Sequence, residues 1–251
     1  MNVLFAAIVA LTNLCGVVGV DTHGARVASY VPASGGEIFF TSATGTGGMP
    51  LCWPWFAGLG PSTSSRRHGI ARYRDFTVVS EQVHSPRDSE LTLRLVSDAE
   101  TRREFPHDFS LTVSIRLADR LIVTMTGENT GSDPFPVTEA LHPYLAVEDS
   151  RRCEVRGVET SECTLYRTGS GRALTFTCTG GGFRIWRPNP ESHSSKTVSS
   201  LAPGDWKRFI CVESGTFANA YLLNPGEKHV LRCALRPAPN VPGACRQDYS
   251  P

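Results

Sequence analysis

A histidine in an apolar setting is the first candidate for chemistry in this sequence. His142 lies in the segment Thr138-Glu139-Ala140-Leu141-His142-Pro143-Tyr144-Leu145, at the end of a run that is typical of a β-strand. Histidine is the side chain whose unperturbed pKa lets it give or take a proton near neutral pH, so His142 is a candidate proton-transfer group. Taken alone, however, the pattern is more often that of a core histidine hydrogen-bonded to a neighbouring strand.

Two distant segments favour the catalytic interpretation. They are Arg67-His68-Gly69-Ile70-Ala71-Arg72 upstream and Cys211-Val212-Glu213 downstream. A guanidinium group can bind phosphate through two hydrogen bonds at once, so arginines around Gly69 would suit an anionic or polyhydroxylated ligand. The alternative, and the commoner case, is that these arginines lie on a solvated loop.

Residues 46–56 have the most unusual composition in the chain. Their sequence is Thr46-Gly47-Gly48-Met49-Pro50-Leu51-Cys52-Trp53-Pro54-Trp55-Phe56. Aromatic side chains stack well on the C–H face of a sugar ring, so the two tryptophans and the phenylalanine suggest a carbohydrate site. A hydrophobic plug that closes one end of a β-sandwich would explain the same residues equally well.

The composition argues against several classes of function. A net charge of +1 provides no basic surface for nucleic acid, and no run of 18 apolar residues could span a membrane. The eight cysteines contain no CxxC pair, which argues against a zinc site or a redox motif and suits a reducing cytoplasm, although an oxidising compartment stays open. Residues 3–11 resemble the apolar part of a secretory signal, but no Lys or Arg precedes them, so we expect a first strand that continues through residues 17–20.

The elements that must position these side chains are predicted to be strands. Apolar residues alternate with polar ones in several segments, as in Leu111, Val113 and Ile115, and no window of a dozen residues has a helical period. The candidate strands are residues 17–20, 23–30, 37–40, 76–83, 90–96, 109–117, 121–126, 172–177, 183–186, 209–213, 220–223 and 229–236. Many strands with Gly/Pro turns predict an all-β fold, a large antiparallel β-sandwich spanning residues 1–236, followed by an irregular tail at 237–251.

The segments together resemble the aldose 1-epimerase superfamily, and most closely its hexose-6-phosphate mutarotase branch, the glucose-6-phosphate 1-epimerases. Besides the three segments quoted above and residues 47–56, the resemblance rests on Phe105-Pro106-His107-Asp108-Phe109-Ser110-Leu111, on residues 129–135 and on Leu223-Asn224-Pro225-Gly226-Glu227. These matches occur in the family's order and cover nearly the whole chain. The resemblance implies a galactose mutarotase-like β-sandwich that interconverts the α and β anomers of an aldose.

The resemblance also implies roles for individual residues. Ring opening removes the proton from O1 and delivers one to the ring oxygen O5; Glu213 would be the base at O1 and His142 the acid at O5, with the roles reversed on closure. His68 and Arg72 would position the substrate, and Arg67 stands where relatives carry a polar ligand-binding side chain. No metal or organic cofactor is needed, and the expected partner is a small sugar or sugar phosphate bound to a cytoplasmic monomer. A carboxylate and an imidazolium some ångströms apart would each favour the other's charged form.

Two departures from the family pattern keep alternatives open. Relatives of the phosphosugar branch carry an arginine where this chain has Thr46, so a mutarotase for unphosphorylated aldoses is an alternative, unless Arg66 or Arg67 compensates. The segment between Val158 and Phe183 is short and lacks the family's Thr-Asp-Arg motif, and Glu159, Glu162 or neither would replace its aspartate. A lost contact of this kind would also suit a non-catalytic carbohydrate-binding protein on the same fold.

Overall fold

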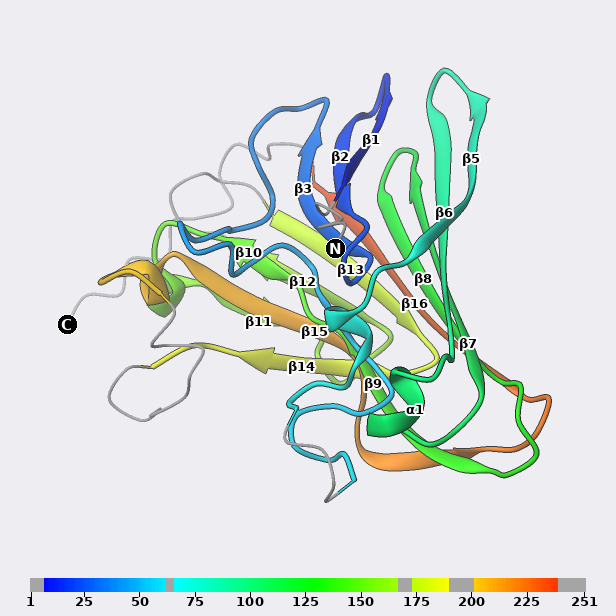
Figure 1. Cartoon of the computed structure of the whole chain (residues 1–251). Helices are drawn as coiled ribbons and strands as arrows, with labels where there is room; N and C mark the ends of the chain where they lie inside the picture. The colour runs from blue at the N-terminus through cyan, green and yellow to red at the C-terminus, as the bar shows by residue number, and fades with distance from the viewer. Residues whose placement is uncertain (1–6, 62–65, 167–172, 190–200, 239–251) are drawn as a thin grey trace.

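The fold consists of antiparallel sheets around one hydrophobic core. The computed structural model describes residues 7–61, 66–166, 173–189 and 201–238. The largest sheet has eight strands, which in spatial order are β11 (Glu154–Arg156), β12 (Glu162–Tyr166), β13 (Ala173–Thr179), β16 (Lys228–Pro237), β8 (Leu121–Asn129), β7 (Phe109–Leu117), β6 (Asp88–Val96) and β5 (Thr77–Ser85). In Figure 1 the β5–β6 hairpin of this sheet rises at the upper right.

A five-stranded sheet and a three-stranded sheet complete the architecture. The five-stranded sheet contains β10 (Tyr144–Ala146), β15 (Phe209–Leu223), β9 (Phe135–Leu141), β4 (Leu51–Cys52) and β14 (Gly182–Trp186). The three-stranded sheet consists of β1 (Ile8–Asn13), β2 (Gly16–Asp21) and β3 (Arg26–Pro32). Buried side chains from all three sheets form one cluster, so the predicted large antiparallel β-sandwich is confirmed.

The alternation seen in the sequence defines the core. On β7 every second side chain is buried, from Phe109 to Leu117, and β6 buries Leu91, Leu93 and Leu95 in the same way. The intervening polar residues therefore face outward, as the two-residue period of a strand requires. Helical structure in the described part of the chain is limited to single turns at α1 (Thr101–Glu104), η1 (Ala71–Tyr73), η2 (Ser150–Arg152) and η3 (Asp205–Lys207), and none of them could span a membrane.

Several predicted boundaries need correction. Residues 37–40 form no strand and contribute only an isolated bridge between Phe39 and Leu145. The segments predicted at 209–213 and 220–223 are the two ends of β15, which continues through an irregularity between Thr216 and Tyr221. The expected first strand is a hairpin of β1 and β2 with its turn at residues 14–15, because Asn13 accepts a hydrogen bond from the backbone N–H of Cys15. Of the predicted tail, residues 239–251 lie outside the described residues, as do His193, which we had expected at the surface, and Arg172 of the strand expected at 172–177.

The tryptophans of residues 46–56 belong to the core. Trp53 is completely buried against Phe109, with ring centroids 4.6 Å apart, and Trp55 is also buried. Neither ring can therefore stack on a sugar, and the hydrophobic-plug interpretation is the correct one for this pair. Gly127 of β8 leaves room for the Trp53 indole, since a Cβ there would lie 2.8 Å from its nitrogen.

One ionisable pair connects the two larger sheets through the interior. Glu139 of β9 is fully buried, and its Oε1 lies 2.6 Å from Nδ1 of His229 on β16. The His229 ring stacks on Tyr221, with centroids 4.0 Å apart, and its side chain is 24% exposed, so this histidine, which we had expected at the surface, is half-buried. Burial raises the pKa of Glu139, while the hydrogen bond from His229 opposes this shift.

We predict that His229→Ala destabilises the fold strongly, because it leaves the buried Glu139 carboxyl without its partner. Breaking such a buried pair costs about 3 kcal/mol or more in unfolding free energy. His84→Ala is the matched control, since His84 makes a more exposed contact of 3.4 Å with Glu90 and its loss should cost no more than about 1 kcal/mol. Urea unfolding measures both, and equal losses would show that the Glu139–His229 pair contributes no more than a surface pair.

Candidate active site

The two predicted proton-transfer residues meet at a break between strands. Leu141 at the end of β9 pairs with Ser214 of β15, and Tyr144 at the start of β10 pairs with Cys211. The two residues of the break, 142 and 143, therefore lie opposite residues 212 and 213. Nε2 of His142 lies 3.0 Å from Oε1 of Glu213, and both side chains are buried.

Backbone contacts fix the position of His142. The backbone N–H of His142 donates a hydrogen bond to the carbonyl oxygen of Pro50 at 3.1 Å, and the backbone N–H of Tyr144 donates to the carbonyl oxygen of Gly48 at 2.8 Å. The Tyr144 ring stacks on the imidazole with a centroid distance of 5.1 Å, and the Trp186 ring of β14 contacts it edge-on at 6.1 Å. Residues 48–50 thus support the site through their backbone carbonyl groups.

His68 and Arg72 are brought to the same place by the segment after β4. Gly69 has a φ of +78°, and a Cβ there would lie 1.9 Å from the carbonyl oxygen of Trp53, so only glycine fits this close approach. The His68 ring lies 5.4 Å from that of His142, centroid to centroid. Arg72 of η1 donates from Nε to the carbonyl oxygen of Leu51 at 2.9 Å and from Nη2 to Sγ of Cys52 at 3.3 Å.

The protonation state of His68 follows from its surroundings. Burial, with the charges of Arg72, Arg67 and Arg184, lowers the pKa of His68 to about 3, so the ring is neutral at pH 7. Its Nδ1 accepts a hydrogen bond from the N–H of Ala57 at 3.2 Å. The proton of the neutral ring therefore resides on Nε2, which makes His68 a hydrogen-bond donor suited to a sugar oxygen.

Burial also governs the His142–Glu213 pair. It raises the pKa of Glu213 to about 7, although the charges of Arg184 and Arg72 act in the opposite direction. The pKa of His142 is lowered well below its usual value, first by burial and then by Arg72 and His68. We had expected each group to favour the charged form of the other; burial is instead the largest cause of both shifts, and it favours the neutral forms.

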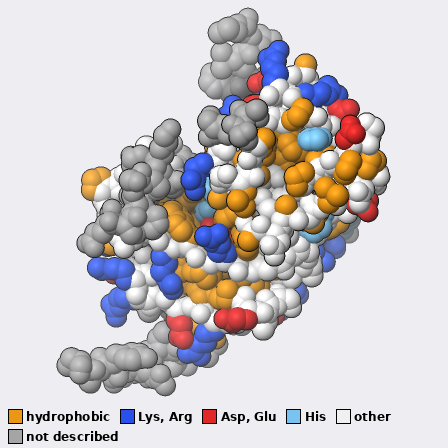
Figure 2. Space-filling view, turned by 90° about the horizontal axis from the view of Figure 1, so that it is seen from below, with side chains coloured by type: hydrophobic (Ala, Val, Ile, Leu, Met, Phe, Trp, Pro, Cys, Tyr) orange, Lys and Arg blue, Asp and Glu red, His pale blue; other side chains and the backbone are white. Residues whose placement is uncertain are grey.

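Two polar atoms of the pair are buried without being hydrogen-bonded. Among the described residues, Oε2 of Glu213 and Nδ1 of His142 have no hydrogen-bond partner. Buried polar atoms are nearly always satisfied, and the described residues contain a few other exceptions, among them Oε2 of Glu139 and Nε1 of Trp53. Figure 2 shows a face on which Lys and Arg side chains lie beside His and acidic side chains within a hydrophobic surface.

Other residues considered in the sequence do not join the site. Arg66 forms an ion pair with Glu104, and its guanidinium lies 4.5 Å from the centroid of the Tyr73 ring, so its contacts are outside the site. Thr46 lies in a turn, where its N–H donates to Oγ of Ser42. Glu159 precedes β12 and Glu162 is its first residue; both are exposed, and no contact among the described residues connects either to the site.

The site also contains residues that the sequence analysis did not identify. Arg184 of β14 is the direct cross-strand partner of Glu213, and its guanidinium carbon lies 5.4 Å from the centroid of the Phe56 ring. The Phe56 ring in turn contacts His68. The sequence could have indicated that Arg184 faces away from the core, because it follows the apolar Phe183 in a predicted strand. Only the register of β14 against β15 shows that Arg184 lies beside Glu213.

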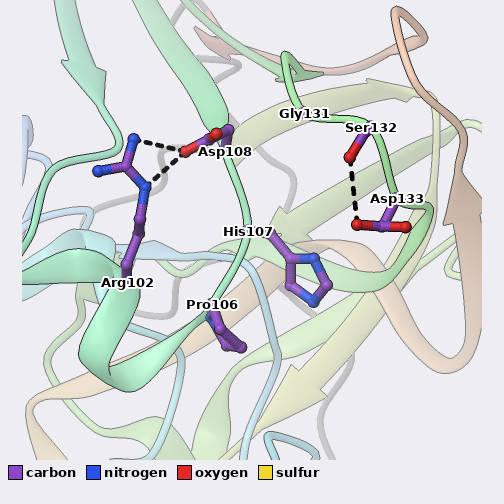
Figure 3. Close-up of a pocket in the computed structure, with 7 residues that line it drawn as sticks. All are labelled: Arg102, Pro106, His107, Asp108, Gly131, Ser132 and Asp133. Atoms are coloured by element: carbon purple, nitrogen blue, oxygen red, sulfur yellow. Dashed lines mark hydrogen bonds and ion pairs between the residues drawn. The ribbon is translucent and has the colours of Figure 1, made fainter.

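A separate hollow of about 100 Å³ lies elsewhere on the molecule. Figure 3 shows Arg102 hydrogen-bonded to Asp108 on one side of this hollow and Ser132 hydrogen-bonded to Asp133 on the other, with His107 between them. His107 packs against Phe105 and Phe135 and does not reach the His142–Glu213 pair. This histidine, which we had considered for the rim of the site, belongs to a different surface.

Comparisons with known proteins agree with this architecture. A curated relative from Escherichia coli K12, named "Putative glucose-6-phosphate 1-epimerase", is 33% identical over 147 residues, which are 54% of this chain and 47% of the relative. A relative of the same name from Salmonella typhimurium is 31% identical over 148 residues, and the chain thus spans about half the length of the curated relatives it matches.

Solved structures show the same fold. The crystal structure titled as a putative mutarotase from Salmonella typhimurium superimposes with a TM-score of 0.82 at 19% identity, covering 92% of this chain and 90% of the other. A galactose mutarotase-like protein from Lactobacillus casei gives a TM-score of 0.73 at 18% identity, with 92% and 100% covered. The family model for aldose 1-epimerase matches residues 13–165, more than half of the sequence, and the chain therefore belongs to the aldose 1-epimerase family.

Proposed function

We propose that this chain is a hexose-6-phosphate mutarotase, a glucose-6-phosphate 1-epimerase that interconverts the α and β anomers by ring opening and closure. The observation that carries the proposal is the buried contact of 3.0 Å between His142 and Glu213. The names of the curated relatives and the basic side chains around the pair support a phosphorylated substrate. The seven cysteines among the described residues are buried thiols, which favours a reducing cytoplasm as the location.

The geometry suits the chemistry because O1 and O5 are both bonded to C1. An acid and a base that act on these two oxygens in one step must lie close together, as His142 and Glu213 do. Glu213 takes the proton of O1, His142 delivers a proton to O5, and the C1–O5 bond breaks to give the open aldehyde. After rotation about C1–C2 the steps reverse on the other face of the carbonyl group, so no proton is gained or lost overall.

The remaining residues hold the sugar in this mechanism. His68 donates from Nε2 to a ring hydroxyl, and Arg72 keeps its guanidinium next to the pair through Leu51 and Cys52. Two alternatives are each favoured by one observation. Thr46 in place of the family arginine favours unphosphorylated aldoses, and the missing Thr-Asp-Arg motif favours a binding protein without turnover.

We expect His142→Ala and Glu213→Gln to reduce anomer interconversion by about 10²–10⁴-fold, the usual contribution of a positioned acid or base. Polarimetry on freshly dissolved α-glucose 6-phosphate and α-glucose measures the rate above the spontaneous reaction. His84→Ala, a histidine on β5 remote from the site, is the control and should keep the wild-type rate. No acceleration by wild type above the spontaneous rate, also with galactose and mannose, would exclude the mutarotase, and if a sugar still bound, the binding protein would remain.

The pH dependence should reveal one shared proton. The reaction needs one acid and one base, so the active form of the pair carries one proton in total. This count is the same whether His142 or Glu213 holds the proton. Because the raised pKa of Glu213 is about 7, the pair holds that proton below this value and loses it above. We therefore expect the catalysed rate to fall as the pH rises from about 6 to about 8, measured with unphosphorylated glucose to keep substrate charge constant. A rate that rises over this range would show that only the deprotonated carboxylate is required.

A further inference from the structure

The thiol of Cys52 is a buried polar group that takes no part in the proton transfers. Cys52 ends β4, is completely buried and packs against Phe56 and Ala140. A free cysteine in such surroundings is usually a small core side chain. Its Sγ, however, lies 3.3 Å from Nδ1 of His68 and accepts a hydrogen bond from Nη2 of Arg72, also at 3.3 Å. One sulfur atom therefore contacts both residues that are expected to hold the sugar.

The protonation state of Cys52 fits both contacts. Burial raises the pKa of this thiol to about 12, although the charge of Arg72 acts in the opposite direction, so the S–H is present at pH 7. A thiol is a weak donor and a weak acceptor at once. Since Nδ1 of His68 carries no proton, the S–H can donate to Nδ1 while the sulfur lone pairs accept from Arg72. A thiolate could also accept from Arg72, but it would repel the lone pair of Nδ1.

His68 depends on such contacts because its backbone is strained. Its φ is +64° and that of Ala57 is +52°, in the left-handed region that residues other than glycine rarely adopt. The N–H of His68 donates to the carbonyl oxygen of Ala57 at 2.7 Å, and the N–H of Ala57 donates to Nδ1 of His68 at 3.2 Å. Conformations of this kind persist only where the surrounding contacts fix them, and they are concentrated at functional sites. Cys52 supplies one of these contacts from β4.

Arg72 is fixed at two points by adjacent residues of the same strand. Its Nε donates to the carbonyl oxygen of Leu51 at 2.9 Å, and its Nη2 donates to Cys52. Two contacts define the plane of the guanidinium group, whereas one contact would leave the group free to turn. Leu51 pairs with Leu141, the last residue of β9, and His142 follows directly. The thiol thus fixes Arg72 to the pair of strands that also positions His142.

We infer that Cys52 is a positioning residue that fixes His68 and Arg72 relative to each other through its two sulfur contacts and thereby sets the affinity of the site for its sugar. This inference rests on the proposed function, because His68 and Arg72 are the residues expected to bind the substrate there. Cys52 itself does not touch the sugar in this arrangement. A thiol that only fills space would be replaced best by valine, whereas a thiol that forms hydrogen bonds would be replaced best by serine.

The ranking of two substitutions separates these roles. Cys52→Ser keeps a donor and an acceptor, whereas Cys52→Val fills the space without either. In isothermal titration calorimetry on the full chain, we expect Cys52→Val to raise the dissociation constants of glucose 6-phosphate and glucose at least about tenfold, and Cys52→Ser to raise them less than about threefold. In polarimetry KM should rise in the same order while kcat changes less, since His68 and Arg72 bind the sugar and do not move its protons.

Three further measurements support the comparison. Cys163 of β12 is also a buried thiol, and no contact among the described residues connects it to the site, so Cys163→Val and Cys163→Ser should leave both affinities unchanged. In an Arg72→Met background, Cys52→Val should weaken binding by at most about threefold more, because the bond from Arg72 is already lost. Cys52→Ala adds no bulk and should weaken binding as Cys52→Val does, and urea unfolding shows which variants are folded.

The outcomes separate this inference from the proposed function. It is overturned if the valine or alanine variant binds the sugars as tightly as Cys52→Ser does, if the effect of Cys52→Val is unchanged in the Arg72→Met background, or if wild type binds neither sugar. The expected ranking in a protein that accelerates no anomer exchange would support the positioning role and refute the mutarotase. A mutarotase whose valine and serine variants have equal KM values would do the reverse.

Discussion

The site depends on removing a carboxyl group and an imidazole from water at a distance of 3.0 Å. Burial disfavours the charged form of each group, so it raises the pKa of Glu213 and lowers that of His142. The two groups then act as one unit that holds a single proton near neutral pH. A reaction that takes a proton from one oxygen and gives a proton to its neighbour needs such a unit.

The same pair of residue types occurs a second time with a different environment. Glu139 and His229 also form a buried contact, but they join β9 to β16 between the sheets, and Tyr221 covers the histidine. Glu139 and His142 lie three positions apart across the end of β9, so one faces the interior and the other the site. A carboxylate–histidine contact is therefore not by itself a sign of catalysis. Each carboxyl group has one buried oxygen without a hydrogen-bond partner, and the difference is in the charges nearby: Arg184 and Arg72 lower the pKa of Glu213, whereas no arginine is among the causes of the shift at Glu139.

The distribution of arginines follows a similar logic. Arg66 and Arg67 are adjacent in sequence, yet Arg66 is bound by Glu104 whereas Arg67 lies at the site without an ion pair among the described residues. Arg184 comes from β14, which pairs with β15 and places this arginine directly opposite Glu213. Positive charge near His68 is thus assembled from segments more than a hundred residues apart.

The sequence by itself determined the fold class and the family, because strand alternation and ordered motifs are local properties. His142, His68, Arg67 and Arg72 were predictable as site candidates from those motifs, and Glu213 from its place after Cys211. Only the tertiary structure decided which histidine is buried with which carboxyl, since that depends on the break between β9 and β10 and on the register against β15. The role of Trp53 as core and the presence of Arg184 beside Glu213 likewise follow from packing and register, which composition and spacing do not encode.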